Sequence, residues 1–169
     1  MMNEKIKKAR DFAIENHGQQ LYDKDKPYVY HLDKVVEIVK PYGFKAQVIG
    51  YLHDVVEDTD VEIYEIEDEF GRFISTCVDI LTDEPGKTRK DRKQPTYKKV
   101  TFFTSDTDKY NIALIVKAAD RLANVLVGKK NDMYKREHEE FKNTYYKPNL
   151  CDEIWELIEK ILFNEGERK

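Results

Sequence analysis

The most constraining feature of this sequence is a long apolar stretch, Ile112 to Val127, in which hydrophobic residues recur at helical spacing. Such a pattern predicts a buried helix. Further helices are predicted where apolar residues repeat in the same way, and no strand pairs of alternating polarity are evident. These predicted helices cover about residues 3–17, 31–39, 45–56, 61–70, 73–81, 132–146 and 150–163. The expected fold is therefore all-α, a compact orthogonal helical bundle forming a single domain over residues 1–169.

Two segments interrupt the helical pattern. Residues 18–27 are predicted to form a loop, and residues 83–96, which are polar and basic and contain Pro85, Gly86 and Pro95, form the longest predicted loop. Residues 97–103 favour a helix, although their β-branched and aromatic side chains would also suit a strand.

Composition excludes several classes of protein. The mean hydropathy is −0.74, and no apolar run approaches the roughly 18 residues that a membrane helix needs. The N-terminus lacks the apolar core of a signal peptide. Cys77 and Cys151 have no CxxC partner, which argues against a cysteine-zinc site and favours a reducing cytoplasm. A net charge of −4 argues against a general nucleic-acid coat protein.

The charge is unevenly distributed along the chain. Residues 87–93 (KTRKDRK) contain five cations and one anion, a local charge of +4 that leaves −8 on the remainder. On an acidic protein such a segment is either a solvated loop or an anion-binding loop, and its composition alone does not separate the two.

Four polar residues lie in unusual positions. His53 and Asp54 occur inside an apolar predicted helix, Asp120 interrupts the helix over 112–127, and His31 lies at the start of another helix. An isolated His-Asp pair is usually capped or lies at the solvent edge, but burial of an ionised carboxylate is costly unless it is paired. Two imidazoles and two carboxylates form a mixed set suited to Mn, Fe, Zn or Ni. Asn124, one helical turn after Asp120, could face the same cavity.

Glu57 and Asp58 follow this pair within HDVVED. They could be a charged helix end, but carboxylates at a helix C-terminus oppose the helix dipole. Glu57 would share a face with His53 and Asp54 if the helix persists. A carboxylate beside an ion-activated water is a suitable general acid or base.

Several motifs together resemble the HD-domain superfamily, specifically the alarmone hydrolase branch of the stringent response: the hydrolase half of Rel/SpoT enzymes and the small Mesh1-like hydrolases. The resemblance spans about residues 9–127 and implies an all-α fold that binds one divalent ion, typically Mn²⁺. It implies that His31, His53, Asp54 and Asp120 are the metal ligands. The matching segments are DFAIENHGQQ, KPYVYH, GYLHDVVEDTD, EFGRFISTCVDILTDE, TRKDRK and IVKAADRLANV.

The same resemblance implies roles for further residues. Glu57 and Asp58 match the catalytic acidic pair. Asn124 matches a substrate-contacting asparagine, Arg89 falls in the basic loop that meets substrate phosphates, and Arg136 resembles a second substrate-binding arginine. The two remaining histidines, His17 and His138, are expected to be structural and at the surface, respectively.

One departure from the family concerns the nucleobase. Family members usually carry an Arg or Lys that stacks on the purine nine to eleven residues before the first metal histidine. Here that window reads Gln-Leu-Tyr-Asp over residues 20–23. Tyr22 could stack instead, and Lys24 or Lys26 could supply charge, so the base preference stays open.

The activity implied by the resemblance is hydrolysis of ppGpp or pppGpp at the 3′ position to GDP or GTP and pyrophosphate. Two alternatives remain at this point. One is hydrolysis of another phosphorylated nucleotide, such as ppApp or the 2′-phosphate of NADPH; the other is a non-catalytic nucleotide-binding module. The expected partner is a nucleotide, with no nucleic acid or membrane, and with an alarmone synthetase as a possible genetic partner to which the chain acts as antitoxin. No synthetase domain is expected before the chain ends at Lys169.

Overall fold

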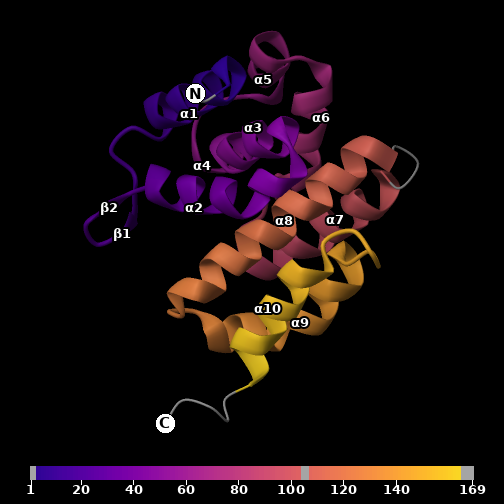
Figure 1. The fold of residues 1–169 in the computed structure, drawn as a ribbon. Coiled ribbons are helices and arrows are strands. Elements are labelled where there is room, and N and C mark those ends of the chain that lie inside the picture. The colour runs from indigo at the N-terminus through magenta and orange to yellow at the C-terminus, as the bar shows by residue number, and fades with distance from the viewer. Residues whose placement is uncertain (1–2, 104–106, 165–169) are drawn as a thin grey trace.

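A computed structural model of the chain describes residues 3–103 and 107–164 and is helical almost throughout (Figure 1). The fold is the predicted helical bundle, with one short antiparallel strand pair beside it. The elements in chain order are α1 (Glu4–His17), β1 (Leu21–Asp23), β2 (Lys26–Pro27), α2 (Val29–Val39), the 3₁₀ turn η1 (Lys40–Tyr42), α3 (Phe44–Leu52), α4 (Val55–Asp58), α5 (Ile63–Phe70), α6 (Arg72–Leu81), α7 (Arg89–Phe102), α8 (Thr107–Val127), α9 (Asn131–Tyr145) and α10 (Asp152–Phe163).

Helix α8 organises the bundle, as its sequence predicts. It lies between α2, α3 and α6 on one side and α9 and α10 on the other (Figure 1). Small buried residues such as Ala118 and Ala119 allow its neighbours to approach closely, and its larger apolar residues, including Leu114 and Val116, fill the core. The prediction of a buried helix over 112–127 is confirmed, and the helix begins one turn earlier, at Thr107.

The prediction of a loop over residues 83–96 is wrong in its second half. Helix α7 begins at Arg89 and continues through Pro95. Thr88 forms a capping box with Asp91, in which each side chain accepts a hydrogen bond from the other residue's backbone N–H. This box satisfies N–H groups that a helix start otherwise leaves unpaired, so the helix can start within a basic segment. Residues 97–102 are thus helical and not a strand.

Two smaller differences concern the predicted helix over 45–56 and the predicted loop over 18–27. The helix predicted over 45–56 is broken at His53 and Asp54, which separate α3 from α4. The predicted loop over 18–27 contains β1 and β2, a minimal hairpin next to α2. None of the described helices combines the length and the apolar composition that a membrane span requires.

Candidate metal centre and substrate cavity

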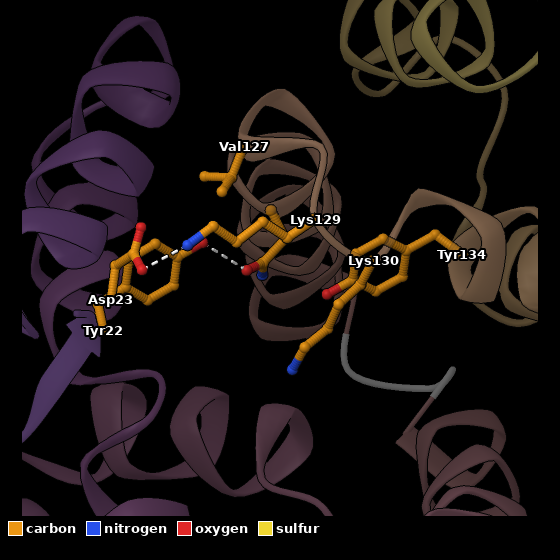
Figure 2. A pocket seen from close by; sticks show the side chains of 7 residues that line it. Tyr22, Asp23, Val127, Lys129, Lys130 and Tyr134 are labelled. Carbon is orange, nitrogen blue, oxygen red and sulfur yellow. Dashed lines mark hydrogen bonds and ion pairs between the residues drawn. The ribbon is translucent and has the colours of Figure 1, made fainter.

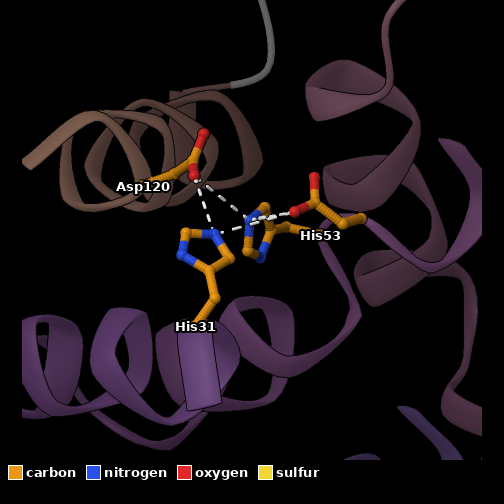
Figure 3. A group of neighbouring side chains, drawn as sticks. His31, His53 and Asp120 are labelled. Carbon is orange, nitrogen blue, oxygen red and sulfur yellow. Dashed lines mark ion pairs between the residues drawn. The ribbon is translucent and has the colours of Figure 1, made fainter. Parts of the chain in front are cut away.

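Four side chains from three parts of the bundle converge on one point. His31 comes from the first turn of α2, His53 and Asp54 from the break between α3 and α4, and Asp120 from the middle of α8. Each offers one ligand atom, and these atoms all lie within 4.8 Å of one another. Figure 3 shows the rings of His31 and His53 and the carboxylate of Asp120 turned toward a common centre. The structure therefore brings together all four residues expected to bind metal.

The break after α3 explains how neighbouring residues can both reach this centre. Three residues before His53, the carbonyl of Gly50 lies 2.7 Å from Nδ1 of the His53 ring. Because a carbonyl only accepts hydrogen bonds, Nδ1 carries the proton in the neutral ring and Nε2 presents a lone pair. Asp54 turns out of the helix as the N-cap position of α4. Its Oδ2 accepts a hydrogen bond from the Tyr28 hydroxyl at 2.7 Å.

The electrostatics of this cluster favour a cation. Nε2 of His53 lies 3.0 Å from Oδ2 of Asp54 and 3.6 Å from Oδ1 of Asp120, and Oδ1 of Asp120 lies 3.1 Å from Nε2 of His31. Yet Nε2 of His53 is buried and makes no hydrogen bond among the described residues. A lone pair facing two carboxylates is stabilised only by positive charge between them. Two nitrogens and two oxygens match the ligand preference of Mn, Fe, Zn or Ni, so the residues fit a divalent ion.

Without an ion, the imidazoles and carboxylates stabilise one another. Burial works to raise the pKa of Asp54, but the positive charge of the adjacent His53 ring, which is protonated on both nitrogens when no ion is bound, outweighs burial and lowers that pKa to about 2. Burial likewise opposes ionisation of Asp120, while His31 and His53 hold its pKa well below the usual value. Both carboxylates are therefore ionised near neutral pH, which is the form that binds a metal.

Glu57 and Asp58 lie beside this cluster on α4 and line the same cavity of about 310 Å³. The Glu57 side chain accepts a hydrogen bond at 2.8 Å from the backbone N–H of Asp83. Both residues are partly exposed. The pKa of each carboxyl group is nevertheless raised above its ordinary value, because each group loses hydration in the cavity and is repelled by Asp54. A raised pKa near a cavity is suited to proton transfer.

Several cations also line this cavity and form a cationic wall, and some of them are already paired. Arg89 makes a bidentate ion pair with Glu137, from Nε at 2.6 Å and Nη2 at 2.9 Å. Nη2 of Arg121 lies 3.6 Å from Glu137, and its guanidinium stacks 3.7 Å from the Phe141 ring centre. Lys93 of the basic segment bonds to both carboxylate oxygens of Asp83. Two of the five cations in the segment 87–93, Arg89 and Lys93, are therefore held in ion pairs.

Asn124 and Tyr22 line the same cavity next to the candidate ligands. Nδ2 of Asn124 donates to Oδ1 of Asp120 at 2.8 Å, and its own Oδ1 accepts from the Tyr22 hydroxyl at 2.9 Å. The Tyr22 ring stacks on His31, with ring centres 4.7 Å apart. Asn124 and Tyr22 thus contact Asp120 and His31, two of the four candidate ligands.

Two residues expected to bind substrate lie elsewhere. Arg136 lines a separate groove between α7 and α9 with Gln94 and Lys98, because it projects from a different face of α9 than Glu137 and Tyr134. Lys24 is exposed in the turn between β1 and β2 and is not among the residues that line the metal-side cavity. The structure does not bring these two residues to the metal cluster.

Sequence reasoning missed several residues that the fold brings into the cavity. Tyr28 precedes His31 by one helical turn, so its position was a usable signal. Lys117 and Arg121 flank Asp120 on α8 and are buried, although charged residues are rarely buried without a local function or partner. Asp83 lies in a segment expected to be an open loop, and nothing local indicated its pairing with Lys93.

The two remaining histidines are both buried. His17 stacks on Tyr28, with ring centres 4.3 Å apart, and hydrogen-bonds to Gln20, in agreement with a structural role. The expectation that His138 lies at the surface is wrong, because it is only 7% exposed. It contacts Phe163 and pairs with Glu159, both on α10.

Comparison with known proteins supplies the family. A model of the HD domain matches residues 9–145. A guanosine-3′,5′-bis(diphosphate) 3′-pyrophosphohydrolase of Aquifex aeolicus is 32% identical over 125 residues, which are 72% of this chain but only 17% of that protein. The pyrophosphohydrolase MESH1 of Xenopus tropicalis is 32% identical over 126 residues, 71% of this chain and 67% of the relative. A solved structure described as a metazoan SpoT ortholog that hydrolyses ppGpp superposes with a TM-score of 0.78 over 98% of each chain, at 20% identity.

Proposed function

This chain belongs to the HD domain family, and from this membership we propose that it is a metal-dependent hydrolase of guanosine tetra- and pentaphosphate. The reaction removes the 3′-pyrophosphate and yields GDP or GTP. The observation that carries the proposal is the convergence of His31, His53, Asp54 and Asp120 beside a cavity that also holds two carboxylates of raised pKa and a cationic wall. The names of the similar proteins give the substrate class.

The residues divide into three roles. His31, His53, Asp54 and Asp120 would hold one divalent ion, for which Mn²⁺ is our candidate. When bound, such an ion supplies Lewis acidity, which polarises a phosphoryl oxygen and lowers the pKa of water toward about 7. Tyr28 donates to Oδ2 of Asp54 and so holds this ligand in place.

Glu57 and Asp58 would handle protons. One carboxylate accepts the proton from the attacking water, and the other delivers a proton to the leaving oxygen of the nucleotide. The bond from the Asp83 N–H fixes the Glu57 side chain against the cavity wall, which limits the conformational freedom lost in the reaction. Their raised pKa brings proton transfer closer to neutral pH.

The cationic wall would receive the phosphates. Arg89 and Arg121 share Glu137, which orients both guanidinium groups before any substrate enters. Preorganised donors stabilise developing phosphate charge without further reorganisation. Lys117, buried on α8, adds a positive charge between Asp120 and Asp83.

The test is a substrate panel with product identification. The purified chain with Mn²⁺ is incubated with ppGpp, pppGpp, ppApp and NADPH, and products are separated by ion-exchange chromatography. The proposal expects pyrophosphate and GDP from ppGpp, lost in Asp54→Ala and retained in the exposed control Asp60→Asn. Release of orthophosphate from NADPH alone, or binding of all nucleotides without turnover, would contradict it.

A further inference from the structure

A small second cavity, of about 90 Å³, adjoins the metal-side cavity (Figure 2). The two cavities share Tyr22, Asn124, Lys130 and Tyr134 in their walls, so they lie side by side. A ligand with its phosphates beside the metal cluster can therefore extend into the second cavity. Its walls come from β1, the end of α8, the connection that follows it and the first turn of α9.

The second cavity has aromatic walls that suit a flat ring. Figure 2 shows the Tyr22 and Tyr134 side chains on opposite sides of it. One face of the Tyr22 ring is covered by His31, at an interplanar angle of 12°, which fixes the orientation of the ring. Val127 adds an apolar side chain. Rigid aromatic surfaces favour stacking with a nucleobase.

A cation and an anion lie side by side in this cavity. Nζ of Lys129, in the connection between α8 and α9, donates to Oδ1 of Asp23, which also accepts from the Lys24 N–H at 2.7 Å. The Asp23 side chain is 21% exposed and that of Lys129 58% exposed. Such an exposed pair contributes little to stability, roughly 0–1 kcal/mol. The Asp23–Lys129 pair can therefore rearrange around a ligand with little loss of free energy. Two protons of Lys129 and Oδ2 of Asp23 are still available for hydrogen bonds.

We propose that Asp23 and Lys129 select guanine by contacting its Watson–Crick edge. This inference rests on the proposed function, which places a purine nucleotide in the adjoining cavity. Guanine presents O6 as an acceptor next to the N1–H and the 2-amino group as donors. Nζ of Lys129 matches O6, and the free Oδ2 of Asp23, with its two lone pairs, matches the two adjacent donors. Adenine places an amino group opposite Lys129 and an unprotonated N1 opposite Asp23, so both contacts become unfavourable.

The inference is tested by varying the base with the phosphates held constant. The ratio of kcat/KM for ppGpp to that for ppApp is measured in wild type, Asp23→Asn, Lys129→Met and Asp25→Asn. Asp25 is the matched control, because it is exposed in the same hairpin turn. We expect a wild-type ratio of at least about 10, and a decrease of about tenfold in Asp23→Asn and Lys129→Met that comes from loss of ppGpp turnover. Asp25→Asn should leave the ratio unchanged.

A second readout separates this inference from the proposed function. The dissociation constants of GDP and ADP are measured by calorimetry on the same proteins with Mn²⁺ present. If GDP is preferred through Asp23 but no alarmone is hydrolysed, the proposed function fails and the base selectivity stands. If ppGpp and ppApp are hydrolysed equally, or if Asp23→Asn weakens both bases equally, the selectivity is refuted while hydrolysis stands. Absence of binding and turnover for every purine nucleotide would overturn both.

Discussion

Replacing Asp83 by asparagine tests the charge network that joins the basic segment to the metal-side cavity. The Asp83 side chain is 4% exposed and accepts hydrogen bonds from Nζ of Lys93 at 2.6 and 2.9 Å. Its backbone N–H donates to Glu57. Lys117, which is buried as well, contributes further attraction to this carboxylate. The Asp83→Asn substitution preserves the shape of the side chain and removes its charge.

The expected loss of stability follows from burial. Removing one partner of a buried ion pair leaves an uncompensated charge and costs about 3–5 kcal/mol. At about 2–4 °C per kcal/mol for a chain of this size, the melting temperature should fall by roughly 6–20 °C. Burial works to raise the pKa of Asp83, but Lys117 and Lys93 outweigh it and hold the pKa below its ordinary value. The stabilisation is therefore complete above the unfolded pKa of about 3.9 and is lost as the pH falls through the folded pKa.

The assay is urea unfolding of wild type and Asp83→Asn at pH 7 and at pH 3.5. The difference in unfolding free energy should be full at pH 7 and smaller at pH 3.5. Asp79→Asn is the matched control, since that side chain is 42% exposed and lies 3.9 Å from Lys99; it should cost at most about 1 kcal/mol. A cost below about 1 kcal/mol for Asp83→Asn at pH 7, or a difference that widens at pH 3.5, would refute the reasoning.

Three further substitutions separate metal binding, proton transfer and phosphate binding. His53→Ala should lose the ion, which elemental analysis measures. It should also lose the stabilisation that the ion gives the wild type in thermal melts, about 2.7 kcal/mol when the ion is present at 100 times its Kd. Full metal content in this variant would exclude His53 as a ligand. Glu57→Gln combined with Asp58→Asn should keep the ion while turnover falls by about 10²-fold or more, and near-wild-type turnover would rule out proton transfer by this pair. Arg89→Ala should lower kcat/KM about tenfold, which corresponds to about 1.4 kcal/mol, and the loss should be smaller for substrates with fewer phosphates. Substitution of its exposed neighbour, Lys90→Ala, should leave kcat/KM unchanged. Equal kinetics for Arg89→Ala and wild type would exclude Arg89 from phosphate binding.

The convergence of the four candidate ligands could be anticipated from the sequence, because three of them, His53, Asp54 and Asp120, break a local rule. Asp120 interrupts an otherwise apolar helix, and His53 and Asp54 follow an apolar run on α3. A carboxylate in such a place needs a partner, and the partner can be inferred without knowing how the helices pack. The helix break at His53 could not be inferred, since the apolar pattern continues on both sides of it.

Ion pairs between helices that are distant in the sequence could not be predicted from local sequence patterns. Arg89 and Glu137 are 48 residues apart, so the segment 87–93 looks like a cluster of free cations until α7 and α9 are packed together. The start of α7 did have a local signal, the Thr88–Asp91 capping box, but the polar composition and Pro95 favoured a loop. His138 lies among charged residues of α9, and only its contact with α10 buries it.

Titration of metal into chelator-treated protein tests the central claim most directly. Pyrophosphate release from ppGpp and bound Mn²⁺ per chain are followed together as the ion is added. Because the four converging side chains offer one site, activity should rise in proportion to the bound Mn²⁺ and saturate at one ion per chain. The Asp120→Ala variant should neither bind the ion nor release pyrophosphate. Undiminished pyrophosphate release from the chelated protein, or full occupancy in Asp120→Ala, would contradict the assignment of this cluster as the catalytic metal centre.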